Sequence, residues 1–146
     1  MAITGGLYLG FVQKLIQGQH IFSDGDSTTY KVSLHTVGYV PNQDTHSTTA
    51  DLSNEASNGN GYTTGGAQIT LGSTTFDTTN ELVAILAVDT TWATITKTFR
   101  IAVIYDTTNN YLVAWLNFGS DQSPSAENYT IFWNTTGIFD ILTPVA

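Results

Sequence analysis

The chain has 146 residues, of which 41% are hydrophobic and 11% charged, and its 12 carboxylates against four lysines and arginines give a formal net charge of −8. Four cations cannot neutralise a run of phosphates, so the composition argues against binding to nucleic acid or to an anionic membrane surface. The absence of cysteine excludes disulfides, thiolate nucleophiles and cysteine-ligated metal sites.

Threonine is the strongest compositional signal, with 25 copies. Its β-branched side chain packs well on a pleated strand and gives that strand an uncharged polar face. We expect one domain over residues 1–146 that is mainly β, a β-sandwich or barrel with one N-terminal α-helix and a long irregular loop. Wide, neutral hydroxyl surfaces suit lateral contact with another protein, which favours a structural or binding role without catalysis.

The start of the chain predicts a short arm and then a helix. Residues 1–6 contain two glycines and no basic region, so we expect an N-terminal arm and no signal peptide. Thr4 is the expected N-cap of the helix, and Gly18 suits the position after its end, where φ becomes positive. We expect the helix to pack on its own sheet, the alternative being that it docks on a partner. Its apolar stripe consists of Leu7, Tyr8, Phe11, Val12, Leu15 and Ile16.

A turn and a strand are expected after the helix. Asp24 and Asp26 begin like a calcium-binding loop, but the glycine and the glutamate that such a loop requires are absent, so residues 23–27 are expected to form a turn. Residues 29–36 alternate between apolar and polar side chains, which predicts a half-buried strand. His35 belongs to the polar face of this strand, where we expect an exposed or interfacial side chain.

Residues 37–66 have little hydrophobic rhythm and are rich in glycine and asparagine. A stretch of this length without secondary structure of its own is uncommon inside a compact domain, and such segments are usually functional or disordered. Four apolar residues are suited to hold it against the rest of the molecule: Tyr39, Val40, Leu52 and Tyr62.

The second half of the chain returns to short strands. A nearly continuous apolar run predicts a buried strand over residues 82–88. Two further short strands are expected, one at 68–71 and one around Phe76. Turn signals at close spacing between such strands are typical of a sandwich or barrel.

Two hairpins are predicted near the C-terminus. Residues 99–105 and 111–118 flank an Asp- and Asn-rich stretch, whose residues tolerate the left-handed conformation of a tight turn. Residues 129–133 and 138–142 flank the turn sequence Asn134-Thr135-Thr136-Gly137 in the same way.

The sequence contains no motif that predicts catalysis, a cofactor or a metal site. His20, His35 and His46 have no metal-ligand spacing, and His46 is expected to be a solvated loop residue. There is no nucleophile elbow and no phosphate-binding glycine loop. Five aromatic residues are candidates for a carbohydrate groove, although strand alternation favours the core for several of them: Trp92, Trp115, Trp133, Tyr105 and Tyr111.

A series of short segments follows one another over residues 6–142. They are Gly6-Leu7-Tyr8-Leu9, Tyr30-Lys31-Val32-Ser33-Leu34-His35-Thr36, Tyr39-Val40-Pro41-Asn42-Gln43-Asp44-Thr45-His46, Asn54-Glu55-Ala56, Gly61-Tyr62-Thr63-Thr64-Gly65-Gly66, Thr91-Trp92-Ala93, Ala102-Val103-Ile104-Tyr105-Asp106, Phe118-Gly119-Ser120-Asp121-Gln122 and Ile131-Phe132-Trp133-Asn134. In this order they resemble a family of small tailed-bacteriophage virion proteins, some of which are head decoration or cement proteins.

The resemblance implies a structural role on the capsid exterior after synthesis in the host bacterial cytoplasm. It implies the major capsid protein as partner, a homotrimer as the oligomer, and no active site. The expected function is to bridge major capsid subunits of the assembled head, and the alternatives are another virion station, such as a head–tail connector or tail protein, or a carbohydrate-binding module. The expected capsid-contact residues are Tyr39, Val40, Pro41, Asn42 and Tyr62.

Overall fold

The computed structural model describes residues 2–135 and 137–142. The molecule is mainly β, as predicted, and resembles a β-sandwich with one N-terminal helix. Its elements are β1 (Thr4–Leu7), α1 (Leu9–Ile16), β2 (Tyr30–His35), the 3₁₀ turn η1 (Thr49–Asp51), β3 (Ala67–Gln68), β4 (Leu71–Asp77), β5 (Leu82–Ala87), β6 (Thr90–Ile95), β7 (Phe99–Asp106), β8 (Leu112–Gln122), β9 (Glu127–Ile131) and β10 (Phe139–Leu142).

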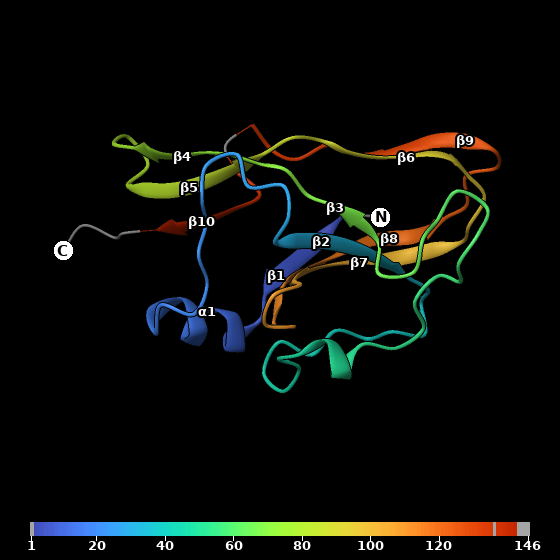
Figure 1. Ribbon diagram of the computed structural model, residues 1–146, viewed down its shortest axis with the longest axis horizontal. Coiled ribbons are helices and arrows are strands. Elements are labelled where there is room, and N and C mark those ends of the chain that lie inside the picture. Colours follow the sequence, from blue (N-terminus) through green and yellow to red (C-terminus); the bar gives the residue numbers. More distant parts are fainter. Residues whose placement is uncertain (1, 136, 143–146) are drawn as a thin grey trace.

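The strands form two layers (Figure 1). One layer is a five-stranded sheet in the order β1-β8-β7-β2-β3, and the other contains the β6-β9 pair and the three-stranded sheet β10-β5-β4. We call the face of the five-stranded sheet that meets the second layer its inner face and the opposite face its outer face. Val32 and Leu34 of β2 are fully buried on the inner face, as their alternation predicts.

The hairpin between β7 and β8 is confirmed. The two strands pair antiparallel, and the carboxylate of Asp106 accepts hydrogen bonds from the backbone N–H groups of Thr108 and Asn109, at 2.7 and 3.2 Å. Asn110 has φ +58°, the left-handed conformation that asparagine tolerates. β7 is almost wholly buried because it lies between β8 and β2 and is covered on both faces.

The N-terminal helix is confirmed, but its predicted start is wrong. Thr4 is not the N-cap, because residues 4–7 pair with β8 as strand β1, and Tyr8, with extended backbone angles, precedes the first helical residue. The predicted arm therefore contributes residues 4–6 to the sheet, and Met1 lies outside the described residues. Gly18 has φ +70° after the helix end, as predicted.

The helix packs on its own sheet through only part of its predicted stripe. Tyr8 and Phe11 are buried against the core, whereas Val12 and Ile16 are 36% and 82% exposed. The prediction that α1 packs on the sheet is confirmed, and its opposite side remains apolar and exposed. No helix in the described part of the chain is long and apolar enough to cross a membrane.

The second predicted hairpin is wrong. β9 pairs with β6, and β10 pairs with β5, so the two segments that were expected to pair belong to different parts of the second layer. The intervening turn includes Thr136, which lies outside the described residues. β6 was not predicted because three of its six residues are threonine, and its large apolar residues, Trp92 and Ile95, do not alternate with polar ones at a period of two. β5 is only half-buried, since one face of the β10-β5-β4 sheet is open to solvent.

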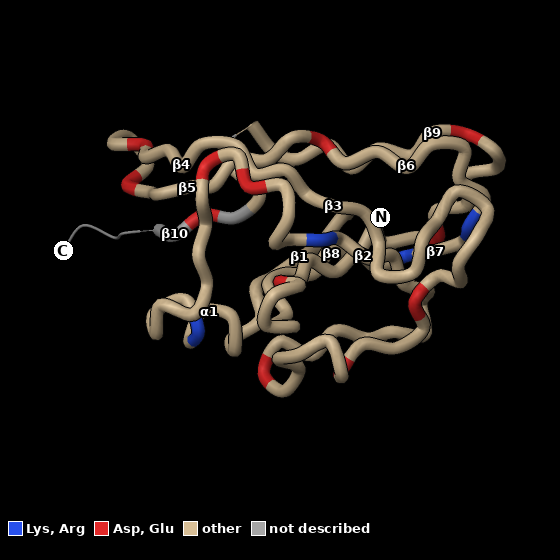
Figure 2. Tube along the Cα trace, viewed as in Figure 1, with Lys and Arg blue, Asp and Glu red and all other residues tan. Residues whose placement is uncertain are grey.

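Residues 36–66 form a long segment whose first part lies across the outer face of the five-stranded sheet, and whose later part, around Asn60 and Gly61, reaches β6 of the second layer before it returns to β3 (Figure 1). Apart from the three-residue turn η1, the segment has no helix or strand, as predicted. Figure 2 shows that the carboxylates are found mainly in turns and loops, with only four cationic side chains in the molecule. The broad strand surfaces are therefore largely uncharged.

Candidate functional site

The most highly organised surface feature is the segment of residues 36–66, held to the sheet by polar side chains. His35 lies beneath it and is completely buried, which corrects the expectation of an exposed side chain. Its Nδ1 lies 2.7 Å from the carbonyl oxygen of Ser53, and its Nε2 lies 2.8 Å from the hydroxyl of Ser33. A carbonyl only accepts, so Nδ1 donates and Nε2 accepts from Ser33. Burial lowers the pKa of His35, which fits a neutral ring.

Tyr39 connects this segment to the start of the helix. Its hydroxyl lies 2.9 Å from the hydroxyl of Tyr8 and 3.1 Å from Nδ1 of His46, whose ring stacks on that of Tyr39. Burial and the Tyr39 contact raise the pKa of Tyr8, so both hydroxyls remain protonated at neutral pH. His46 is therefore half-buried against Tyr39 and is not the solvated loop residue that we expected.

Tyr62 holds the other end of the segment. Its hydroxyl donates to Oε1 of Glu55 at 2.7 Å and accepts the backbone N–H of Leu34 at 3.0 Å. Glu55 also accepts the N–H of Gly65 at 2.6 Å, and the hydroxyl of Tyr105 donates to the carbonyl of Gly65. Each buried polar group here has a partner, which keeps the segment in one conformation.

The five predicted contact residues divide into two groups in the structure. The side chains of Tyr39 and Tyr62 are each only 2% exposed, so they hold the segment in place and are not available to a partner. Val40, at 74% exposure, faces solvent, and Pro41 is half-exposed beside it. Asn42 is exposed, but its side-chain oxygen accepts the backbone N–H groups of Asp44 and Thr45. Val37 adds a second exposed apolar side chain to the same segment.

A polar cavity of about 450 Å³ lies between this segment and the sheet. Ser33 lines this cavity, and its pair with His35 resembles a nucleophile and its base, but Ser33 is 1% exposed and Nδ1 of His35 faces a backbone carbonyl. A catalytic pair of this kind needs an accessible hydroxyl and a group that stabilises the imidazolium, usually a carboxylate. The geometry therefore favours a structural role for the pair.

His20 occupies a buried aromatic environment at the other end of the molecule. Its ring contacts Phe11, Tyr111 and Tyr30, and its Nδ1 lies 3.4 Å from Oδ2 of Asp106. Burial lowers the pKa of His20, and the Asp106 carboxylate opposes that shift. Over residues 2–135 and 137–142 there is no group of three or more His, Asp or Glu side chains placed to hold a metal ion.

The aromatic residues proposed for a carbohydrate groove are mainly in the core. Trp92, Trp133 and Tyr105 are each at most 9% exposed, and Trp115 and Tyr111 are half-buried. A groove that stacks sugars on exposed rings is therefore not formed by this set.

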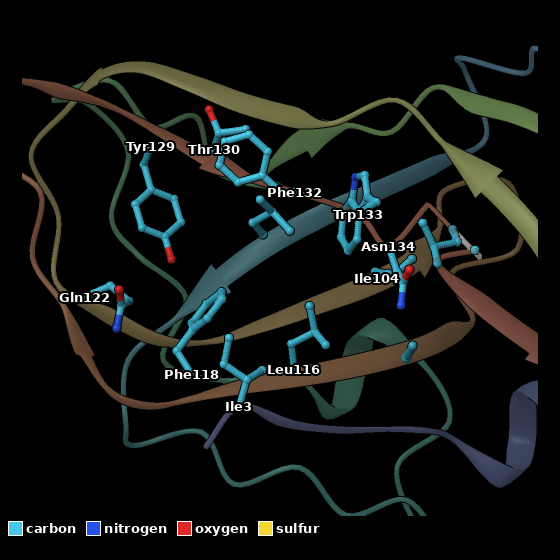
Figure 3. A pocket seen from close by; sticks show the side chains of 14 residues that line it. Ile3, Ile104, Leu116, Phe118, Gln122, Tyr129, Thr130, Phe132, Trp133 and Asn134 are labelled. Atoms are coloured by element: carbon cyan, nitrogen blue, oxygen red, sulfur yellow. The ribbon is translucent and has the colours of Figure 1, made fainter. Parts of the chain in front are cut away.

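A second cavity of about 450 Å³ lies between the two layers (Figure 3). In Figure 3, Leu116 and Phe118 of β8 face Tyr129 and Trp133 across it. Sequence reasoning missed this cavity because its wall combines β7, β8, β9 and residue 3, which no local pattern connects. None of its lining residues is charged: Ile3, Ile104, Ala114, Leu116, Phe118, Gln122, Tyr129, Thr130, Ile131, Phe132, Trp133, Asn134, Gly137 and Ile138.

Comparison with protein-family models, with curated proteins and with solved structures gave no match to this chain.

Proposed function

We propose that this protein is a bacteriophage head decoration, or cement, protein that binds the outside of the assembled capsid and bridges major capsid subunits. The observation that carries the proposal is the surface of residues 36–66, which is hydrogen-bonded to the rest of the fold and presents Val37 and Val40 to solvent. The ordered similarity of short segments to small virion proteins supplies the identity of the partner.

The rigidity of the segment supports a binding role. Association is costly when loops must be ordered at the interface, and a surface that is already ordered avoids that cost. The buried hydroxyls of Tyr39 and Tyr62 and the ring of His35 hold residues 36–66 before any partner arrives. Exposed valines on such a surface then supply apolar area for contact.

The charge distribution also supports a place on the outer surface of a DNA-filled shell. The net charge of −8 is repelled by packaged DNA, and the strand faces are covered by neutral side chains. Such faces favour contact between neighbouring copies, because the carboxylates lie mainly in turns and loops and not on the strand faces.

The proposed mechanism is binding without catalysis. A protein that binds only the assembled shell stabilises it by mass action. A trimer that contacts several subunits gains further through multivalency, so that each single contact needs only modest strength. Pressure from packaged DNA separates subunits, and a bridge between neighbours opposes that separation.

The direct test is to locate the protein in a cryo-EM reconstruction of the intact particle. We expect density for it at local three-fold positions on the outer capsid surface. Density at the head–tail junction or in the tail would contradict the proposal in favour of another virion station, and absence from purified particles would contradict both.

A binding test with matched variants examines the surface itself. Val40→Asp places a charge on the proposed contact surface, whereas Val88→Asp places one on an exposed valine of the second layer, 59% exposed. We expect Val40→Asp to reduce occupancy on capsids about tenfold, as one unfavourable charge in a contact does, and Val88→Asp to leave occupancy unchanged. Equal occupancy for both variants would contradict the assignment of residues 36–66.

A further inference from the structure

The cavity between the layers opens beside an unusually unprotected strand edge. β1 is the last strand of its sheet and pairs only with β8 among the described strands. Proteins usually protect such edges with charges, proline, bulges or very short strands. β1 is short, with the sequence Thr-Gly-Gly-Leu, but it pairs in regular register and contains no charge, no proline and no bulge.

The other edge strands of the molecule carry the protection that β1 lacks. β3 has only two residues, β4 has a register shift between Leu71 and Thr74, and β6 has one between Trp92 and Ile95. β9 begins with Glu127, and β10 contains Asp140. Among the described edge strands, β1 alone has no charge, bulge or two-residue length to limit pairing.

The register of β1 places its inner face directly at the cavity. Gly5 pairs with Leu116 of β8, and Leu7 pairs with Ala114 of β8. Leu116 and Ala114 both line the cavity. Gly5 has no side chain to cover Leu116, and a Cβ there would lie 2.8 Å from the carbonyl oxygen of Trp115. The cavity is therefore accessible from the edge of the sheet that β1 forms.

The rim of the cavity is apolar and exposed. Ile3, just before β1, is 65% exposed, and Phe132, just after β9, is 78% exposed. Both line the cavity and are labelled in Figure 3. Large apolar side chains at the mouth of an uncharged cavity mark a surface suited to an apolar partner and unsuited to an ion.

We propose that this open side of the sandwich binds an extended segment of a partner polypeptide, which adds a strand to β1 and places alternate apolar side chains in the cavity. A free strand edge requires an occupant with backbone N–H and C=O groups in strand spacing, and the cavity requires apolar side chains at every second position. An alternating apolar strand meets both requirements, whereas a lipid or a small apolar molecule fills the cavity and leaves the edge unpaired.

The experiment uses the isolated protein, so its outcome does not depend on the capsid role. The probe is the peptide acetyl-Lys-Thr-Val-Thr-Ile-Thr-Val-Lys-amide, titrated while amide chemical shifts and tryptophan fluorescence are recorded. We expect shifts at Gly5 and Gly6 and a fluorescence change from Trp133, which lines the cavity. Absence of binding would overturn the inference.

A backbone-modified peptide separates strand addition from simple filling of the cavity. It has the same side chains, with N-methyl groups on the two central amides that face β1. Because two hydrogen bonds are lost, we expect binding at least about tenfold weaker. Equal binding of the two peptides would overturn strand addition. Monomeric octyl glucoside, an apolar chain without a peptide backbone, is a second probe, and its binding as tightly as the unmodified peptide would also overturn strand addition.

Two surface variants test the location. Ile3→Asp charges the rim of the cavity, and Ile21→Asp charges an equally exposed isoleucine away from it, at 71% exposure. We expect Ile3→Asp to weaken peptide binding about tenfold and Ile21→Asp to have no effect. Both positions are exposed enough for the variants to fold, which far-UV circular dichroism checks, and equal effects of the two would overturn the location.

Discussion

The hydroxyl of Ser33 lies 2.8 Å from Nε2 of His35, and the two side chains share the outer face of β2. The carbonyl of Ser53, 2.7 Å from Nδ1, fixes which nitrogen carries the proton. The pair therefore joins the sheet to the segment of residues 36–66 through a neutral imidazole whose two nitrogens are both hydrogen-bonded.

Replacing His35 is expected to destabilise the fold. His35→Leu removes the hydrogen bonds to the carbonyl of Ser53 and the hydroxyl of Ser33, and leaves that hydroxyl only a long contact of 3.5 Å to the carbonyl of Val103, so we expect a loss of about 2 kcal/mol in the free energy of unfolding. Urea denaturation measures this loss. Ser53→Ala is the control, because it keeps the backbone carbonyl, and its effect is expected to stay within about 0.5 kcal/mol. Equal stability of His35→Leu and the parent protein would contradict the role of the pair.

Acidification is expected to destabilise the protein before its carboxylates titrate. Burial lowers the pKa of both His20 and His35 below the ordinary value of 6.5. As the pH falls, the histidines of the unfolded chain therefore bind protons before those of the folded protein do. The free energy of unfolding keeps its full value above the ordinary histidine pKa and decreases below it. We expect a lower urea midpoint at about pH 5.5 than at about pH 7.5.

Variants at the histidines identify the groups responsible. His20→Leu removes one buried imidazole and is expected to flatten the pH dependence, whereas His46→Gln keeps both buried rings and is expected to preserve it. A midpoint that does not change between the two pH values in the parent protein would show that neither ring is kept neutral by the fold.

Removing the hydroxyl of Tyr62 is expected to loosen the segment of residues 36–66. Tyr62→Phe leaves the N–H of Leu34 and one oxygen of Glu55 without this partner, so we expect a loss of about 2 kcal/mol and faster hydrogen exchange at Gly65. The hydroxyl of Tyr129 makes no hydrogen bond within the described residues, so Tyr129→Phe serves as control. Unchanged exchange at Gly65 would argue that apolar packing alone holds the segment.

Two glycines with similar backbone angles are expected to respond differently to alanine. Gly66 has φ +79°, and a Cβ there would clash with the backbone carbonyl of Val32. Gly25 has φ +76° with nothing within 4 Å. Gly25→Ala should cost about 1 kcal/mol for the left-handed conformation alone, whereas Gly66→Ala should cost more than about 3 kcal/mol or prevent folding. Thermal unfolding compares the two variants. Equal losses of stability for both would mean that the backbone around Gly66 moves and relieves the clash.

Local pattern was sufficient wherever neighbouring residues in the chain decide the structure. The alternation of residues 29–36 predicts β2, and the Asp- and Asn-rich stretch before Tyr111 predicts the β7–β8 hairpin with its left-handed Asn110. Pattern failed for β6, because threonine stabilises a strand through its partners more than through hydrophobic alternation. Pattern also failed for the second hairpin, because β9 pairs with β6 and β10 pairs with β5 instead of with each other.

The sequence by itself determined the mainly β fold, the single N-terminal helix, the lack of charge on the strand faces and the irregular nature of residues 37–66. Only the tertiary structure decided that this segment covers the outer face of β2, which buries His35 and turns Tyr39 and Tyr62 from candidate contacts into internal supports. The cavity beside β1 was also decided only by the tertiary structure. Burial and strand pairing depend on contacts between residues far apart in the chain, and local spacing carries no information about those contacts.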